Sequence, residues 1–93
     1  MWTVQLRRDV KKQVRKLPEP VRRALTAWIG IAEMEGPVGL RAASGLNDEA
    51  LRGVWKGYRS SRLSRQYRVI YRVERDIVSI LVVEVTAHDY RRK

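Results

Sequence analysis

The hydrophobic residues of this chain change their spacing near its middle, from a helical period to an alternating one. Val10, Val14 and Leu17 fall at i, i+4 and i+7, which places them on one face of a helix. The next segment carries a second stripe of this kind, made of Val21, Leu25, Trp28 and Ala32. From residue 57 onwards apolar and polar residues alternate instead, which is typical of β-strands. The chain is therefore predicted to combine two helices with a sheet.

Prolines and glycines indicate where the predicted helices begin and end. Asp9 is a candidate cap for the first helix, whose opposite face is basic. Pro18 and Pro20 end that helix and open the second one, which is predicted to stop at Gly36-Pro37. Two helices joined in this way form a hairpin. The segment 38–47, rich in glycine and small residues, is predicted to be a loop.

Four segments have the pattern of strands. Residues 2–6 alternate, residues 57–63 and 67–73 follow the loop, and Arg75-Asp76 is predicted to be a tight turn. Residues 77–85 are almost continuously aliphatic, which predicts a central strand covered on both faces. The order is a strand, two helices and then an antiparallel meander of three strands. This order predicts an α+β domain with both helices packed on one face of the sheet.

Length and composition restrict the classes of protein further. The chain has 93 residues, so we expect one domain spanning residues 1–93. It has no apolar run long enough for a membrane and no signal-peptide layout at its start, so we expect a cytoplasmic protein. It has no cysteine and only one histidine, His88, which excludes disulfides, thiolate sites and a histidine-based zinc site. We therefore expect neither metal nor cofactor.

Positive charge is the strongest compositional signal. Twenty lysines and arginines against ten acidic residues give a net charge of +10. Residues 50–73 contain seven basic residues and no acidic one. Such a field attracts polyanions, so the sequence predicts a surface that binds nucleic acid or the ribosome. A solvated basic surface, or one neutralised by an acidic partner, is the alternative interpretation.

Three segments of the sequence resemble the RelE/ParE toxin superfamily. The first is Glu49-Ala50-Leu51-Arg52-Gly53, and the second runs from Gly57 to an Arg-apolar-apolar-Tyr motif, Arg68-Val69-Ile70-Tyr71. The third, Val83-Glu84-Val85-Thr86-Ala87-His88-Asp89-Tyr90, lies where the ribonuclease branch of the family keeps a catalytic His or Arg and often a Tyr. The resemblance covers nearly the whole chain and implies a RelE-like compact domain.

The resemblance also implies a reaction, the metal-independent cleavage of messenger RNA on the ribosome. The ribose 2′-hydroxyl attacks the adjacent phosphate and leaves a 2′,3′-cyclic phosphate, which requires a base, an acid and fixed cations. Arg68 is implied as the phosphate clamp because a guanidinium grips two oxygens and keeps its charge. His88 is the candidate acid, because its ordinary pKa lies near neutrality. Glu49 is the candidate base, by analogy with YoeB-like members, and Tyr90 is expected to stack on a base or orient the phosphate.

Each of these four residues also has a purely structural alternative. For Arg68 the alternative is a salt bridge on a sheet face, and for His88 it is a hydrogen bond to the backbone. Glu49 can equally be a solvated loop carboxylate, and Tyr90 can equally pack in the core. The tail sequence His-Asp-Tyr also differs from the terminal His-Tyr of YoeB-like members, so the assignment of acid, base and clamp stays open.

The remaining basic residues are predicted to bind RNA. Arg59 and Arg62 lie where RelE-like and YoeB-like members respectively carry basic active-site residues, although the RelE-like pattern has lysines where this chain has Arg59 and Ser61. The other predicted contacts are Lys11, Lys12, Arg15, Lys16, Lys56 and Arg65. The implied partners are a cognate antitoxin, the ribosome and mRNA. The alternatives are a ParE-like inhibitor of DNA gyrase and an RNA- or ribosome-binding module without chemistry.

Overall fold

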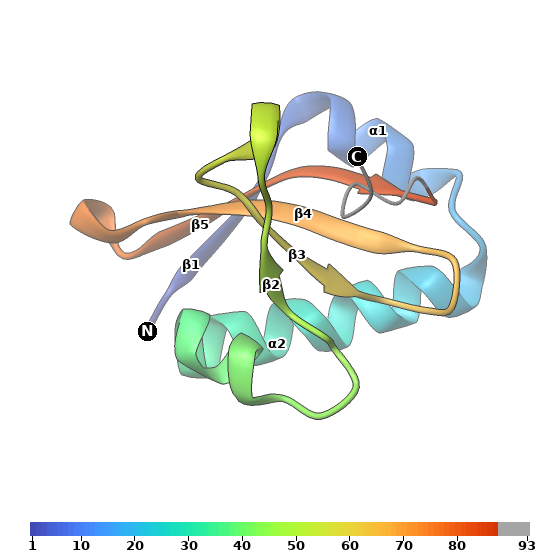
Figure 1. Cartoon of the computed structure of the whole chain (residues 1–93). Helices are drawn as coiled ribbons and strands as arrows, with labels where there is room; N and C mark the ends of the chain where they lie inside the picture. The colour runs from blue at the N-terminus through green and yellow to red at the C-terminus, as the bar shows by residue number, and fades with distance from the viewer. Residues whose placement is uncertain (88–93) are drawn as a thin grey trace.

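A computed structural model describes residues 1–87, which form one five-stranded sheet and two helices (Figure 1). The helices are α1 (Arg8–Arg15) and α2 (Glu19–Ala42), and single turns of 3-10 helix form η1 (Gly53–Trp55) and η2 (Arg75–Ile77). The strands are β1 (Thr3–Leu6), β2 (Glu49–Ala50), β3 (Arg59–Arg62), β4 (Arg68–Glu74) and β5 (Ser79–Thr86). Their order across the sheet is β1-β5-β4-β3-β2. The predicted α+β class and the order of elements are confirmed.

The main core lies between the sheet and the two helices. One buried cluster joins the helices to Tyr71 of β4. It contains Val10 of α1, Leu17 just after α1, and Leu25 and Trp28 of α2. Trp28 and Tyr71 meet edge to face, with ring centroids 5.2 Å apart. The two helical stripes in the sequence are therefore core, and the predicted hairpin is confirmed.

Helix α2 continues past the predicted stop at Gly36-Pro37. Gly36 has φ 67° and ψ −163°, so the backbone leaves the helical conformation there and then resumes it up to Ala42. Pro37 fits at this break because the first residues of a helical segment need no N–H donor. The buried Leu40 anchors the resumed helix in the main core. The prediction of a loop over residues 38–47 was therefore wrong for residues 38–42.

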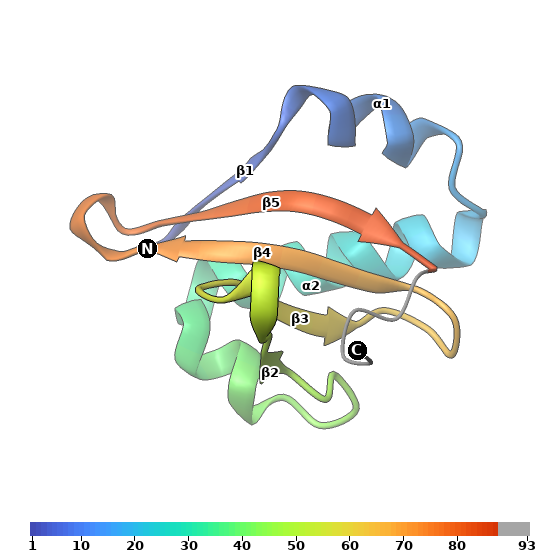
Figure 2. The same ribbon diagram turned by 45° about the horizontal axis from the view of Figure 1, so that its top comes forward.

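Strand β5 is an interior strand next to the middle strand β4, and it pairs with β1 in parallel and with β4 in antiparallel orientation (Figure 2). Its register with β4 shifts by one residue between Ile70 and Tyr71. Because of this bulge, Val82 and Val85 both join the main core although they are three residues apart. Val83 faces the other side, where it joins Leu51 and Ile70 in a second, smaller cluster.

The remaining boundaries differ from the sequence-based expectation by a few residues. β3 is shorter than the predicted 57–63, and β5 begins at Ser79 because η2 occupies the expected tight turn at residues 75–76. The two-residue strand β2 was not predicted. None of the helices within residues 1–87 is both long and apolar enough to cross a membrane.

Candidate active site on the open face of the sheet

Arg68 is held in a fixed position on the face of the sheet opposite the helices. Its Nε donates to Ser60 Oγ at 3.0 Å and one Nη donates to the carbonyl oxygen of Asn47 at 3.1 Å. Asn47 adopts a positive φ of 45°, a conformation that asparagine tolerates better than most residues. The Arg68 side chain is only 6% exposed, because the segment 47–49 lies over this face.

Glu49 lies beside Arg68, as the proposed pairing of base and clamp requires. The two side chains approach to 3.8 Å between Glu49 Oε2 and Arg68 Nη2, and the Glu49 side chain is 43% exposed. Strand β2 positions this carboxylate. Glu49 pairs with Ser60 of β3, and residues directly opposite each other on neighbouring strands share a face of the sheet. The Glu49 side chain is therefore partly exposed, although its Oε2, the oxygen nearest to Arg68, is buried.

A second arginine reinforces the positive charge of this face. Arg62 is directly opposite Arg68 in the antiparallel register, so the two side chains project from the same face. Like charges in this arrangement repel each other, and a bound anion relieves that repulsion. The backbone of Arg62 is held by a 2.6 Å hydrogen bond from its N–H to the Leu46 carbonyl oxygen. The pair therefore favours a phosphate or another anion between the strands.

The same face also carries acidic residues that the sequence analysis did not select, among them Glu84. Glu84 is opposite Ile70 in the register, and Ile70 is two residues along β4 from Arg68. Residues two apart in a strand share a face, so Glu84 belongs to the Glu49–Arg68 side of the sheet. Its position in the β-bulge of β5 is not readable from sequence.

Arg59 does not belong to this site, although the sequence grouped it with Arg62 and Arg68. It is opposite Tyr71, whose ring is in the main core, so it projects from the helix-facing side of the sheet. Its Nε donates to Asp48 Oδ1 at 2.7 Å, and Asp48 also accepts from Ser61 Oγ at 2.6 Å and from Tyr71 Oη at 2.5 Å. Burial, followed by the hydrogen bond to Asp48, raises the pKa of the Tyr71 hydroxyl.

The alternation of side chains along a strand predicts that Arg59 and Arg62 lie on opposite faces of the sheet. Positions three apart in a regular strand face opposite sides, so these two arginines cannot both line one face. Asp48, which is fully buried and organises the Arg59 side, was not singled out because its partners come from β3 and β4. Only the strand pairing brings them together.

The other predicted RNA contacts are spread over the surface. Lys56 and Arg65 are exposed in the connections before β3 and before β4. The basic residues of the first helix are also exposed: Lys11, Lys12, Arg15 and Lys16. The basic residues of α1 flank the end of the sheet that carries Arg68. Gln13 of α1 hydrogen-bonds with Val85 of β5, and the next residue, Thr86, pairs with Arg68.

Two of the four predicted catalytic residues, His88 and Tyr90, lie outside the residues that the structure describes. Within residues 1–87, no group of three acidic, histidine or cysteine side chains is arranged to hold a metal ion. The described part of the site offers a rigid guanidinium, a neighbouring arginine and a partly exposed glutamate side chain. These groups can bind a phosphate and accept a proton beside it.

The sequence matches no protein-family model and no curated protein. Solved structures do match it over nearly the full length. A chain of the archaeal RelE–RelB complex from Pyrococcus horikoshii OT3 has 22% identity and a TM-score of 0.73, with 99% of this chain and 97% of that chain covered. The YoeB/ParE toxin from Agrobacterium tumefaciens has 18% identity and a TM-score of 0.74, with coverage of 94% and 99%.

A third match comes from the toxin–antitoxin complex RelBE2 of Mycobacterium tuberculosis. It has 20% identity and a TM-score of 0.68, and the alignment covers 91% of this chain and 95% of that one. All three likenesses extend over at least nine-tenths of both chains. They show a shared fold at low sequence identity.

Proposed function

We propose that this chain, which has the fold of the RelE and YoeB toxins, belongs to the RelE/ParE superfamily and is the toxin of a type II toxin–antitoxin system. Its proposed activity is the metal-independent endonucleolytic cleavage of mRNA on the ribosome. The observation that carries the proposal is the placement of Glu49 within 3.8 Å of the anchored Arg68 on the open face of the sheet. A ParE-like gyrase inhibitor has no use for a proton acceptor beside a phosphate clamp.

The proposed reaction divides between these groups as follows. Glu49 takes the proton from the ribose 2′-hydroxyl as its oxygen forms a bond to phosphorus. Arg68, with Arg62 beside it, stabilises the added negative charge on the phosphorane. The bond from phosphorus to the 5′-oxygen then breaks, and the leaving oxygen receives a proton from His88, with Tyr90 orienting the phosphate. The products are a 2′,3′-cyclic phosphate and a 5′-hydroxyl.

The ribosome and an antitoxin are the proposed partners. An arginine cannot exchange its proton, so much of the rate must come from positioning of the message, which the ribosome supplies. The net charge of +10 favours an antitoxin that is acidic where it contacts the toxin. The RelE–RelB and RelBE2 complexes support this assignment, since both matched structures contain a toxin with its antitoxin.

The test compares cleavage of mRNA on translating ribosomes by the wild type, Glu49→Gln and His88→Gln. Glu19→Gln, at the exposed start of α2, is the control that, like Glu49→Gln, removes one negative charge. We expect each active-site variant to lose about 100-fold or more in cleavage rate, and the control to cut normally. Wild-type cleavage by Glu49→Gln, or arrest of DNA gyrase without mRNA cleavage, would overturn the proposal.

A further inference from the structure

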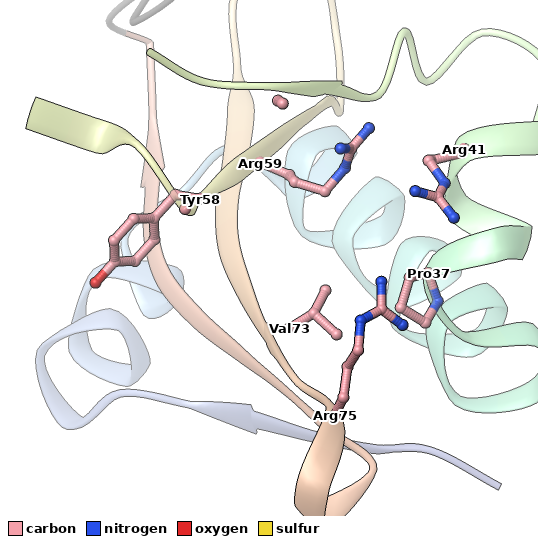
Figure 3. Close-up of a pocket in the computed structure, with 8 residues that line it drawn as sticks. Pro37, Arg41, Tyr58, Arg59, Val73 and Arg75 are labelled. Carbon is pink, nitrogen blue, oxygen red and sulfur yellow. The ribbon is translucent and has the colours of Figure 1, made fainter. Parts of the chain in front are cut away.

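A second basic site lies on the helix-facing side of the sheet, at the end remote from Arg68 (Figure 3). It is a pocket of about 260 Å³ between the last turns of α2, the start of β3 and the end of β4. Three arginines from three different elements line it: Arg41 of α2, Arg59 of β3 and Arg75 of η2. None of its lining residues, all of which belong to the described part of the chain, is acidic.

The three guanidinium groups differ in how they are held. Arg59 is fixed, because its Nε is bound to the fully buried carboxylate of Asp48 at 2.7 Å. Arg41 and Arg75 are exposed, and neither makes an ion pair with any residue between 1 and 87. Counting Asp48 against the three arginines leaves the pocket with two uncompensated positive charges. One preoriented guanidinium and two exposed ones form a clamp for an anion.

The size and walls of the pocket favour a nucleotide unit over a lone carboxylate. Pro37, Val73 and Ala50 give it apolar walls between the charged groups. A carboxylate fills only a small part of this volume, whereas a phosphate with its ribose places charge on the arginines and carbon against the apolar walls. We propose that this pocket binds the phosphate backbone of single-stranded RNA.

This contact is separate from the candidate active site. Arg68 and Val73 are five residues apart along β4, which is about 17 Å, and they face opposite sides of the sheet. One phosphate therefore cannot touch both sites. The pocket grips a different stretch of RNA from the one at Arg68, and it does so whether or not the chain cleaves RNA.

The experiment measures binding of the full chain to a short fluorescent RNA whose riboses are 2′-O-methylated, so that the proposed cleavage cannot occur. The test variant is Arg41→Gln with Arg75→Gln. The control is Arg22→Gln with Arg23→Gln, which removes the same charge from the exposed start of α2. Arg41→Lys with Arg75→Lys keeps the charge. Thermal melting checks that all variants fold.

For two lost phosphate contacts, we expect the slope of log affinity against log salt to become shallower by about 1.4 and affinity at 0.1 M salt to fall about 25-fold. The control pair is expected to change the slope by less than half as much as the test pair does. The lysine pair is expected to keep most of the wild-type slope and affinity. Equal effects of the test and control pairs would overturn the proposal. So would a test variant that loses binding to polyglutamate but not to RNA, because the pocket would then serve an acidic protein.

Discussion

The carboxylate of Glu49 and the guanidinium of Arg68 lie 3.8 Å apart, yet one is 43% exposed and the other only 6%. Ser60 and Asn47 hold the arginine, whereas the glutamate sits on a two-residue strand at the margin of the sheet. This asymmetry suits the proposed roles of a fixed cation and of a proton acceptor on a partly exposed side chain. It also means that the arginine is expected to contribute to stability as well as to the proposed chemistry.

Arg68→Ala is expected to destabilise the fold and to abolish activity. Its loss leaves Ser60 and the carbonyl of Asn47 without their donor, which costs about 1–3 kcal/mol of unfolding free energy. The loss of a preorganised charge lowers the cleavage rate about 100- to 1,000-fold. Urea unfolding and ribosome-dependent cleavage assays measure the two effects. Arg65→Ala, in the exposed turn before β4, is the control and is expected to change stability by less than about 0.5 kcal/mol.

The pH dependence of stability is expected to report on Tyr71. Burial and the bond to Asp48 raise the pKa of this tyrosine above its ordinary value of 10.0. The folded state therefore keeps the proton where the unfolded state loses it. The resulting stability is complete below pH 10 and falls above it, by about 1.4 kcal/mol per pH unit.

Tyr71→Phe separates this contribution from other alkaline effects. The variant is expected to be about 1.5–3 kcal/mol less stable at pH 7, because it loses a hydrogen bond to a charged acceptor. Above pH 10 its unfolding free energy should fall less steeply than that of the wild type. Parallel slopes for the two proteins in urea titrations would show that Tyr71 does not titrate as proposed.

Two glycines of α2 are expected to respond in opposite ways to alanine. At Gly36 a Cβ would lie 2.3 Å from Nε1 of Trp2, and the φ of 67° with an extended ψ is available almost only to glycine. Gly36→Ala should cost at least about 2 kcal/mol. Gly30, also in α2, has open space within 4 Å of the position that a Cβ would occupy, so Gly30→Ala should stabilise by about 0.5–1 kcal/mol. Thermal melting of both variants checks the difference in sign.

Gln13 extends the sheet where β1 ends. Its side-chain amide donates to the carbonyl oxygen of Val85 and accepts from the Val85 N–H, so it replaces a neighbouring strand at that residue. Gln13→Ala is expected to cost about 1–3 kcal/mol and to accelerate hydrogen exchange at the Val85 amide. Gln66→Ala, in the exposed turn before β4, is the control. Unchanged exchange at Val85 in Gln13→Ala would contradict the assignment.

The sequence predicted the layers of the fold because its periodicity is strong. Val10, Leu25 and Trp28 were recognised as core from helical spacing alone, and the continuous apolar run of β5 indicated a central strand. The break at Gly36-Pro37 was misread as an end. Propensity identifies where a helix is interrupted, but the burial of Leu40 decides that it resumes.

The candidate site was predictable in composition and less so in arrangement. Strand alternation puts Arg68, which precedes the core residue Val69, on the side away from the main core. Alternation within one strand does not reveal whether a distant segment covers that side of the sheet. In this structure residues 47–49 cover it. The same alternation, applied to Arg59 and Arg62, would have separated them. The buried Asp48 was not predicted because its three donors come together only through strand pairing.

The parallel pairing of β1 with β5 has a consequence for the time at which the sheet is completed during synthesis. Thr3 pairs with Ser79, so the first strand has no partner until nearly all of the described chain has left the ribosome. Strand β4, which carries Arg68, also lacks its neighbour on that side until then. Long-range pairings of this kind form late in folding. A nascent chain that already contains Glu49 and Arg68 therefore still lacks the strand pairings that complete the sheet around them, so the proposed cleavage is expected to begin only after β5 has emerged.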